Sequence, residues 1–362
     1  MQIIYHYIFR CHCIYWRQYM MNGGSAGKSA DNQGGGHMKE LLQRLCDKYL
    51  LTLGLLTDLY PLERDILYPV CANVFCAADA GFELEKFTAS MNMIKQNPKL
   101  LSSLRSTVRP LIASWLAVSE DPRGELDKYL DCYELLRKYF TNSEHLALLS
   151  VLIARITPQG QAEERIKRGR HIYDLMKKEH RILTTKEDVA FAVMLAFSEK
   201  TDSGLIEDME ESYRLLRHSA DNNSIQTVSH VLAMSDSAPE EKCEKFGRLK
   251  DEMVQKGRKY GKHYELAMLA ALAITDRSCE DITRDVSDIE AFLGEYRTVN
   301  DLSGFGTEEK GIHAFMLLTT AYSGDESSVP TEKRRALLAA RQAALYSVMV
   351  YSMMTVAPVV PK

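Results

Sequence analysis

Two kinds of apolar pattern alternate along the chain from about residue 80 onward. In the amphipathic kind, apolar side chains recur at helical spacing, as Met209, Tyr213 and Leu216 do, and charged side chains occupy the other faces. The segments VAFAVMLAF (189–197) and LAMLAALAI (266–274) instead contain no charge. A helix of that composition must be buried on most sides. The alternation predicts helical hairpins, each an amphipathic helix followed by a buried apolar helix.

The hairpin pattern repeats. Tyr133, Tyr173 and Tyr213 lie 40 residues apart, Phe246 follows after 33, and each precedes a polar turn and a second apolar stretch. The segments that share this order are 83–118, 132–154, 172–198, 212–235, 245–274 and 288–324. Because such hairpins cannot bury their own apolar faces, we predict an all-α fold, an array of stacked helical hairpins with repeats of about 33–47 residues, like an α-solenoid. An irregular helical bundle is the alternative, and the sequence leaves open whether the array is open or closed.

The first 37 residues differ from this pattern. The triplet GKS (27–29) resembles the end of a phosphate-binding loop, but Asn22 stands where such a loop needs its first glycine. Residues 33–38 can be back-translated into a ribosome-binding sequence followed by a start codon. We therefore interpret residues 1–37 as a non-native leader, either mistranslated or engineered, and expect it to be disordered.

The C-terminal segment is unusually apolar. After Arg341, residues 342–360 carry no charge, which is close to the length that crosses a bilayer. Several polar side chains and the prolines near the end make a buried closing helix the better interpretation, with membrane contact and a dimer interface as alternatives. We expect a helical-repeat domain over residues 38–330, and a C-terminal apolar helix and tail over 331–362 packed on the array.

Charge and cysteine content narrow the class of protein. After the leader, 42 basic and 48 acidic residues give a net charge of −6 without a strongly basic stretch, so we expect no nucleic-acid partner. The cysteines of this part are scattered and form no Cys-x-x-Cys pair, which indicates buried free thiols in a reducing cytoplasm. In the leader, Cys11, His12 and Cys13 lack a second pair of ligands, so we expect no zinc site there.

Three segments resemble a known family. They are RKYGKHYELAMLAALAI (258–274), the Gly-Phe-Gly loop (304–306) with the helix after it, and ARQAALYSVMV (340–350). Together with the hairpin series they resemble a bacterial family typical of Firmicutes, the domain of unknown function numbered four thousand and three. The resemblance covers about residues 40–355. It implies a cytoplasmic bacterial protein, and it brings no activity, substrate or catalytic residue.

The sequence shows no catalytic constellation. No Ser or Cys nucleophile lies in a recognisable motif, and no His-Glu-x-x-His pair occurs. The histidines occur singly, so we expect them at helix caps or on the surface. They are His145, His171, His180, His218, His230 and His313. We predict no catalytic, cofactor or metal site, and no cofactor.

Two basic runs form the one candidate binding surface. The run RIKRGRHIYDLMKKEHR (165–181) is the densest, and KGRKYGKHY (256–264) follows at the corresponding turn of a later repeat. A solvated helix face is the ordinary explanation. If both runs lie on one edge of the array, they would form a rim that binds an anion or an acidic partner. The candidate residues of this rim are Lys167, Arg168, Arg170, Lys256, Arg258, Lys259 and Lys262.

These observations favour a non-catalytic, cytoplasmic scaffold that binds a protein or peptide, because stacked hairpins form extended surfaces. One alternative is an enzyme whose site is assembled across repeats. The other is a membrane-associated protein anchored by the C-terminal helix. The partner and the oligomeric state cannot be inferred from the sequence.

Overall fold

The computed structural model describes residues 33–59, 67–97, 108–158, 160–179, 184–258, 263–294, 307–324 and 331–355. The chain divides into two compact units, Met1–Met38 and Lys39–Lys362. Within the described ranges the chain forms helices and no strand, which confirms the all-α prediction. Most of the predicted leader (1–32) lies outside these ranges, although a helix already begins at Gln33, four residues before the predicted end of the leader.

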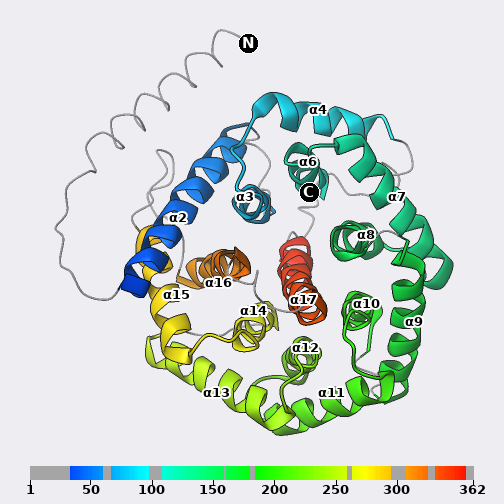
Figure 1. Cartoon of the computed structure of the whole chain (residues 1–362), viewed down its shortest axis with the longest axis vertical. Helices are drawn as coiled ribbons and strands as arrows, with labels where there is room; N and C mark the ends of the chain where they lie inside the picture. The colour runs from blue at the N-terminus through cyan, green and yellow to red at the C-terminus, as the bar shows by residue number, and fades with distance from the viewer. Residues whose placement is uncertain are drawn as a thin grey trace, which may run out of the picture. The chain divides into compact units, whose positions relative to one another are not determined.

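The second unit is built from helical hairpins, in each of which one helix is amphipathic and the next is apolar (Figure 1). The amphipathic helices are α2 (Gln33–Leu59), α4 (Leu84–Lys95), α7 (Pro122–Tyr139), α9 (Ala162–Glu179), α11 (Asp202–Leu216), α13 (Pro239–Gln255) and α15 (Cys279–Gly294). Their apolar partners are α3 (Tyr68–Ala77), α6 (Arg109–Ala117), α8 (Glu144–Ile156), α10 (Val189–Leu195), α12 (Asn222–Leu232), α14 (His263–Ala273) and α16 (Thr307–Gly324). A 3₁₀ turn, η2 (Lys186–Asp188), precedes α10. The six predicted hairpins are confirmed, and the α2–α3 hairpin was not predicted.

The hairpins of the second unit form a closed ring, with the amphipathic helices outside and the apolar helices inside (Figure 1). At the closure, α16 packs against α3. The Tyr49 hydroxyl on α2 lies 2.7 Å from Nδ1 of His313 on α16. The Thr320 hydroxyl on α16 donates to Oδ1 of Asn73 on α3, over 3.0 Å. These contacts answer the question that the sequence left open: the array is closed.

Local sequence explains where the helices begin and which face each one buries. Asp121, Thr201 and Asp221 each precede a helix, and their side chains accept a hydrogen bond from a backbone N–H of its first turn. Such N-caps stabilise a helix by about 1 kcal/mol. Every residue of α10 is buried, whereas α11 buries one side through residues such as Leu205 and Met209. The inner helices therefore form the core, and the outer helices shield it.

Helices α9 and α10 approach each other unusually closely at Gly169. A Cβ atom added to Gly169 would lie 2.7 Å from the Cα of Val193 on α10. Real Cβ atoms essentially never come that close to another heavy atom. The absence of a side chain at this position therefore sets the spacing of the two helices.

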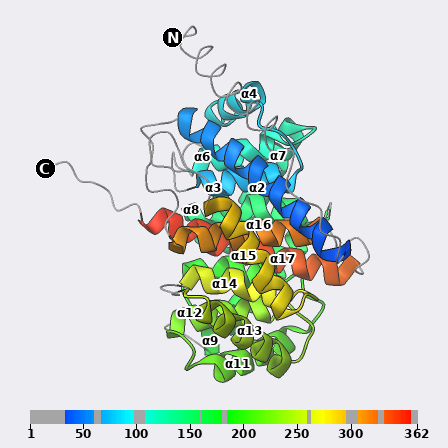
Figure 2. The same cartoon turned by 90° about the vertical axis from the view of Figure 1, so that its left-hand side faces the viewer.

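The last helix, α17 (Thr331–Thr355), lies inside the ring (Figure 1). It packs against α8, α10, α12 and α14, and to a smaller extent against α16. Figure 2, turned by 90°, shows it running through the second unit. Arg341, which directly precedes the predicted uncharged run, is buried there and donates to the Ser323 hydroxyl over 2.6 Å. Among the described helices, none combines the length and the apolarity needed to cross a bilayer.

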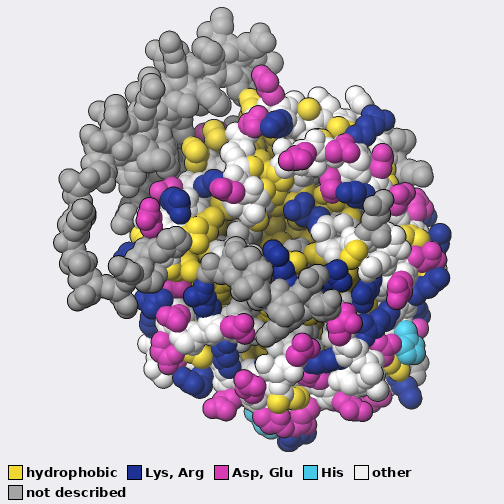
Figure 3. Space-filling model, viewed as in Figure 1, with side chains coloured by type: hydrophobic (Ala, Val, Ile, Leu, Met, Phe, Trp, Pro, Cys, Tyr) yellow, Lys and Arg dark blue, Asp and Glu magenta, His cyan; other side chains and the backbone are white. Residues whose placement is uncertain are grey.

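One side of α17 remains partly exposed. Its half-exposed residues are Arg335, Leu338, Gln342 and Leu345, which share one face because they recur at helical spacing. Figure 3 shows that the face of the second unit seen in Figure 1 is hollowed near the middle, between α3 and α6, and that hydrophobic side chains gather there. We call this depression the apolar hollow.

Candidate functional site

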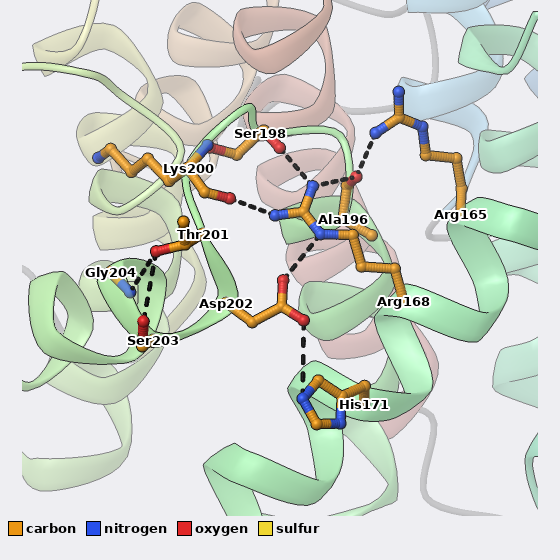
Figure 4. A network of polar contacts seen from close by, with 10 residues as sticks. All are labelled: Arg165, Arg168, His171, Ala196, Ser198, Lys200, Thr201, Asp202, Ser203 and Gly204. Carbon is orange, nitrogen blue, oxygen red and sulfur yellow. Dashed lines mark hydrogen bonds and ion pairs between the residues drawn. The ribbon is translucent and has the colours of Figure 1, made fainter.

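The predicted rim residues of the first basic run lie on α9, and their charges are satisfied within the chain. Arg168 donates from Nε to Oδ1 of Asp202 over 2.8 Å and from Nη1 to the Ala196 carbonyl over 3.1 Å (Figure 4). It also donates to the carbonyls of Ser198 and Lys200. Every nitrogen of this guanidinium therefore has an acceptor.

The contacts of Arg168 explain why an arginine stands there. Helix α10 ends at Leu195, and the carbonyls at a helix C-terminus lack partners within the helix. Arg165 donates from Nη1 to the Ala196 carbonyl over 2.8 Å and assists Arg168. The positive charges also face the negative end of the helix dipole. Arg168 thus caps α10 and ties α9 to the start of α11.

The same arrangement recurs at the next inner helices. Lys200 donates to the carbonyls of Ala233 and Ser235, which follow α12. Lys245 donates to the carbonyl of Thr275, which follows α14. A cation from one hairpin therefore caps the C-terminus of an inner helix, so much of the basic content of these turns stabilises the ring.

The other two rim residues of α9 are more exposed. Lys167 Nζ lies 3.1 Å from Oε1 of Glu163, and Arg170 Nη2 lies 2.7 Å from Oδ1 of Asp174. Arg170 also donates to the carbonyl of Tyr139 over 3.1 Å. Exposed pairs one helical turn apart are screened by solvent and contribute little to stability. An anion could reach these cations only by competing with the acids already beside them.

The second basic run lies elsewhere in the ring. Lys256 donates to the Ser287 hydroxyl over 2.9 Å, and Arg258 is paired with Glu290, so both contact α15. Lys259 and Lys262 lie outside the residues that the structure describes. Helix α11 stands between α9 and α13 in the outer wall (Figure 1). A rim shared by the two runs stays a prediction.

A small pocket lies between two successive hairpins, where the sequence indicated nothing. Its enclosed volume is only about 10 Å³, which is room for about one water molecule. The residues that line it come from α9, the segment before η2, α11 and α12. They are Met176, Thr184, Ile206, Met209, Glu210, Tyr213, Gln226, Ser229 and His230.

A buried carboxyl–imidazole pair lies beside this pocket, and its imidazole, from His230, is one of the lining side chains. Nδ1 of His230 on α12 lies 3.8 Å from Oδ1 of Asp188, at the end of η2, and its ring packs on Phe191 at 5.4 Å between centroids. Such a pair is a common arrangement for moving a proton, although apo distances are often long. Both side chains are almost fully buried. The pair is therefore the strongest candidate for chemistry in the described part of the chain.

Asp188 also has a structural role. Its Oδ2 accepts from the backbone N–H of Thr185 over 2.7 Å, and the Thr185 hydroxyl accepts from the N–H of Glu187, which together form a capping box. Burial raises the pKa of Asp188 to about 6, and the hydrogen bonds from Thr185 oppose this shift only in part. The carboxyl is thus held closer to neutrality than an exposed aspartate.

We expect the free energy of unfolding of the Asp188→Asn variant to depend less on pH than that of the wild type. Asp188 has a pKa of about 3.9 when unfolded and about 6 when folded, so the native state binds more protons between these values. Its contribution to the free energy of unfolding is present below pH 4 and falls by about 2–3 kcal/mol as the pH rises through 6. Chemical denaturation at pH 4 and at pH 7.5 measures it. A stability curve for Asp188→Asn that runs parallel to that of the wild type would contradict the raised pKa.

Three of the predicted surface histidines are in fact buried. His145 packs edge-on against Tyr346 of α17, with ring centroids 6.2 Å apart, and His230 faces Asp188. His313 bonds Tyr49, and burial lowers its pKa to about 4. The prediction was wrong for these residues because each lies on an inner helix that faces the core. The prediction was right for His171 and His218, which are exposed, and His180 lies outside the described residues.

The described cysteines are all free and buried. Burial raises the pKa of Cys76 to about 12 and that of Cys132 to about 11, so their thiols are poor nucleophiles at neutral pH. Among the residues with described side chains, no group of three or more His, Cys, Asp or Glu is placed to hold a metal ion. Cys11, His12 and Cys13 lie outside that part of the chain.

Comparisons with known proteins match most of the chain. The chain is 26% identical over 246 residues to the uncharacterized protein YeaA of Bacillus subtilis (strain 168), a match that covers 64% of this chain and 74% of YeaA. No solved structure is significantly similar. Residues 58–348 match the family described as "Protein of unknown function (DUF4003)". These residues span nearly all the hairpins and most of α17, so the chain belongs to the DUF4003 family.

Proposed function

We propose that the protein is a non-catalytic, cytoplasmic scaffold that binds a protein or peptide partner in the apolar hollow. The observation that carries this proposal is the gathering of hydrophobic side chains in a depression of the ring (Figure 3). Apolar surface that a soluble fold leaves uncovered commonly marks an interaction site. The buried free cysteines suit a reducing cytoplasm.

The position of α17 supports this location. Because α17 packs mainly on α8, α10, α12 and α14, it leaves the side of α3 and α6 less filled. Leu338 and Leu345 lie on its half-exposed face. A partner that inserts an apolar side chain or helix beside α17 would remove this surface from water, at about 25 cal/mol per Å² of apolar area.

We expect Leu338→Lys and Leu345→Lys to weaken partner binding at least tenfold, because each places a charge on the surface that the partner covers. The matched control is Leu215→Lys on the outer wall, where the leucine is 39% exposed. The full chain serves as bait in native lysate, and captured proteins are identified by mass spectrometry and chemical crosslinking. Calorimetry confirms that each variant is folded.

The supporting outcome is a partner that the wild type and Leu215→Lys retain and that both α17 variants lose. Equal capture by all four proteins would place the partner elsewhere on the ring. Failure of the wild type to capture any protein from soluble or detergent-solubilised fractions would contradict the scaffold proposal.

An enzyme with a site assembled across repeats is the second candidate, and the Asp188–His230 pair favours it. The pocket beside this pair draws its residues from two successive hairpins, α9–α10 and α11–α12. If the protein is an enzyme, His230→Gln would abolish its catalytic activity and leave capture of a protein partner unchanged. Membrane contact through α17 stays a prediction from the sequence alone.

A further inference from the structure

Four charged side chains converge where α13 ends, beside the last turns of α15 and the first turns of α16. These helices pack side by side in the ring (Figure 1). Lys256 and Arg258 follow α13, Glu290 belongs to α15, and Lys310 belongs to α16. The cluster holds three cations and one carboxylate. Two positive charges are therefore left uncompensated within it.

Arg258 is the centre of the cluster. Its side chain is only 10% exposed, Nη2 donates to Oε2 of Glu290, and the guanidinium lies 5.7 Å from the ring centroid of Phe315 on α16. Nη1 is shielded from solvent and has no hydrogen-bond partner among the residues that the structure describes. A buried donor without an acceptor is costly, so this position favours a ligand that supplies an oxygen.

Arg258 differs from Arg168 in the acceptors that its guanidinium finds. Arg168 lies on α9, and each of its nitrogens reaches a carboxylate or carbonyl oxygen. Arg258 has the carboxylate but lacks the carbonyls, since Nη1 remains without an acceptor in the described structure. The capping role that explains Arg168 therefore does not explain Arg258.

The two lysines flank the guanidinium from different helices. Lys256 donates to the Ser287 hydroxyl on α15, which holds its ammonium beside the cluster. Burial raises the pKa of Glu290, and the charges of Arg258, Lys310 and Lys256 each oppose that rise. Lys256 is exposed and Lys310 is half-buried, so both can turn toward a ligand.

Two glycines border the cluster. A Cβ atom on Gly294, the last residue of α15, would lie 3.5 Å from Nζ of Lys310. A Cβ atom on Gly311, in α16, would lie 3.9 Å from Oε1 of Glu290. Glycine is favoured where a backbone must approach a ligand closely. Neither position adds a side chain beside the charged groups.

We propose that Arg258, Lys256 and Lys310 form a binding site for the phosphate group of a small molecule. A tetrahedral oxyanion offers several acceptor oxygens, so that one oxygen can accept from Nη1 of Arg258 while others meet the two ammonium groups. A planar carboxylate has only two oxygens and satisfies fewer of these donors at once. Glu290 orients the guanidinium through Nη2 and leaves Nη1 for the ligand.

Binding of phosphate to the full chain tests the site. Titrations with inorganic phosphate and with phenyl phosphate, at constant ionic strength set with sodium chloride, are followed by calorimetry and by ³¹P NMR. The first probe reports free phosphate, and the second reports a phosphorylated organic molecule. We expect saturable binding of at least one probe and a rise in the melting temperature with its concentration.

Variants identify the residues. Arg258→Met and Lys310→Gln should each weaken binding at least tenfold, because each removes a charged donor. The control is Arg248→Met on α13, an exposed arginine paired with Glu280 outside the cluster. Its affinity should equal that of the wild type. If Arg258→Met fails to fold, Lys310→Gln and Lys256→Gln carry the test.

The proposal is overturned if the wild type binds neither probe at a probe concentration of about 20 mM, which is 20 times a dissociation constant of about 1 mM. It is also overturned if Lys310→Gln and Lys256→Gln bind as tightly as the wild type. Tighter binding of phenyl phosphate than of inorganic phosphate would assign the site to a phosphorylated metabolite-like molecule. The reverse order would assign it to free phosphate.

Discussion

The Asp208→Asn variant is expected to lose about 3–5 kcal/mol of the free energy of unfolding at pH 7, because it leaves a buried ammonium without its counter-charge. Lys242 on α13 has a side chain that is 1% exposed, and its Nζ lies 2.7 Å from Oδ2 of Asp208 on α11. Lys200 reaches the same oxygen over 2.6 Å. Burial lowers the pKa of Lys242, and the charge of Asp208 opposes that shift. Urea denaturation measures the loss.

Two further variants make this prediction specific. Lys242→Met should be close to neutral, since a methionine fills the same space and Lys200 still compensates Asp208. Asp281→Asn removes a carboxylate that is 40% exposed and paired with Arg284, so it should cost less than about 1 kcal/mol. A loss for Asp208→Asn as small as that for Asp281→Asn would contradict the role assigned to the buried pair.

The Gly169→Ala variant is expected to destabilise the protein by about 3 kcal/mol, because the new methyl group would meet the α10 backbone. The nearest atom is the Cα of Val193, at 2.7 Å, which cannot move without shifting the inner helix. Thermal and urea denaturation both report the change. A retained far-UV circular dichroism spectrum would show that the helices still form.

The same substitution on another outer helix should have the opposite sign. Gly247 lies within α13, and a Cβ atom there would meet nothing within 4 Å. Gly247→Ala should therefore stabilise the protein by about 1 kcal/mol, the difference in helix propensity between the two residues. If both alanine variants changed stability equally, the close approach of α9 and α10 would not be the cause.

The hairpins could be predicted because their signal is local. Apolar spacing on α11 and the uncharged runs of α10 and α14 depend only on neighbours along the chain. Closure could not be predicted, because it depends on the accumulated rotation between hairpins and on contacts such as Tyr49–His313, which are 264 residues apart. The α2–α3 hairpin was missed because its amphipathic helix did not share the spaced aromatic residues of the later units.

The role of the basic residues could be predicted from the sequence only in part. The basic runs are visible in the sequence. The acceptors of Arg168, however, are mostly backbone carbonyls, which every residue has and which no sequence motif can indicate. The pair Asp188–His230 was missed for a related reason. Its two members lie 42 positions apart on different hairpins, and only the packing of α10 against α12 brings them together.

Ring closure also changes how the protein can fold and how its length can vary. Open repeat arrays fray from their terminal units and tolerate the gain or loss of a unit. In the described part of the ring each hairpin has neighbours on both sides, so there is no end from which unfolding can begin, and loss of order should be all-or-none. An extra hairpin would also widen the lumen beyond what one helix, about 10–12 Å across, can occupy. Because the single helix α17 fills the centre, the ring can hold only a fixed number of hairpins.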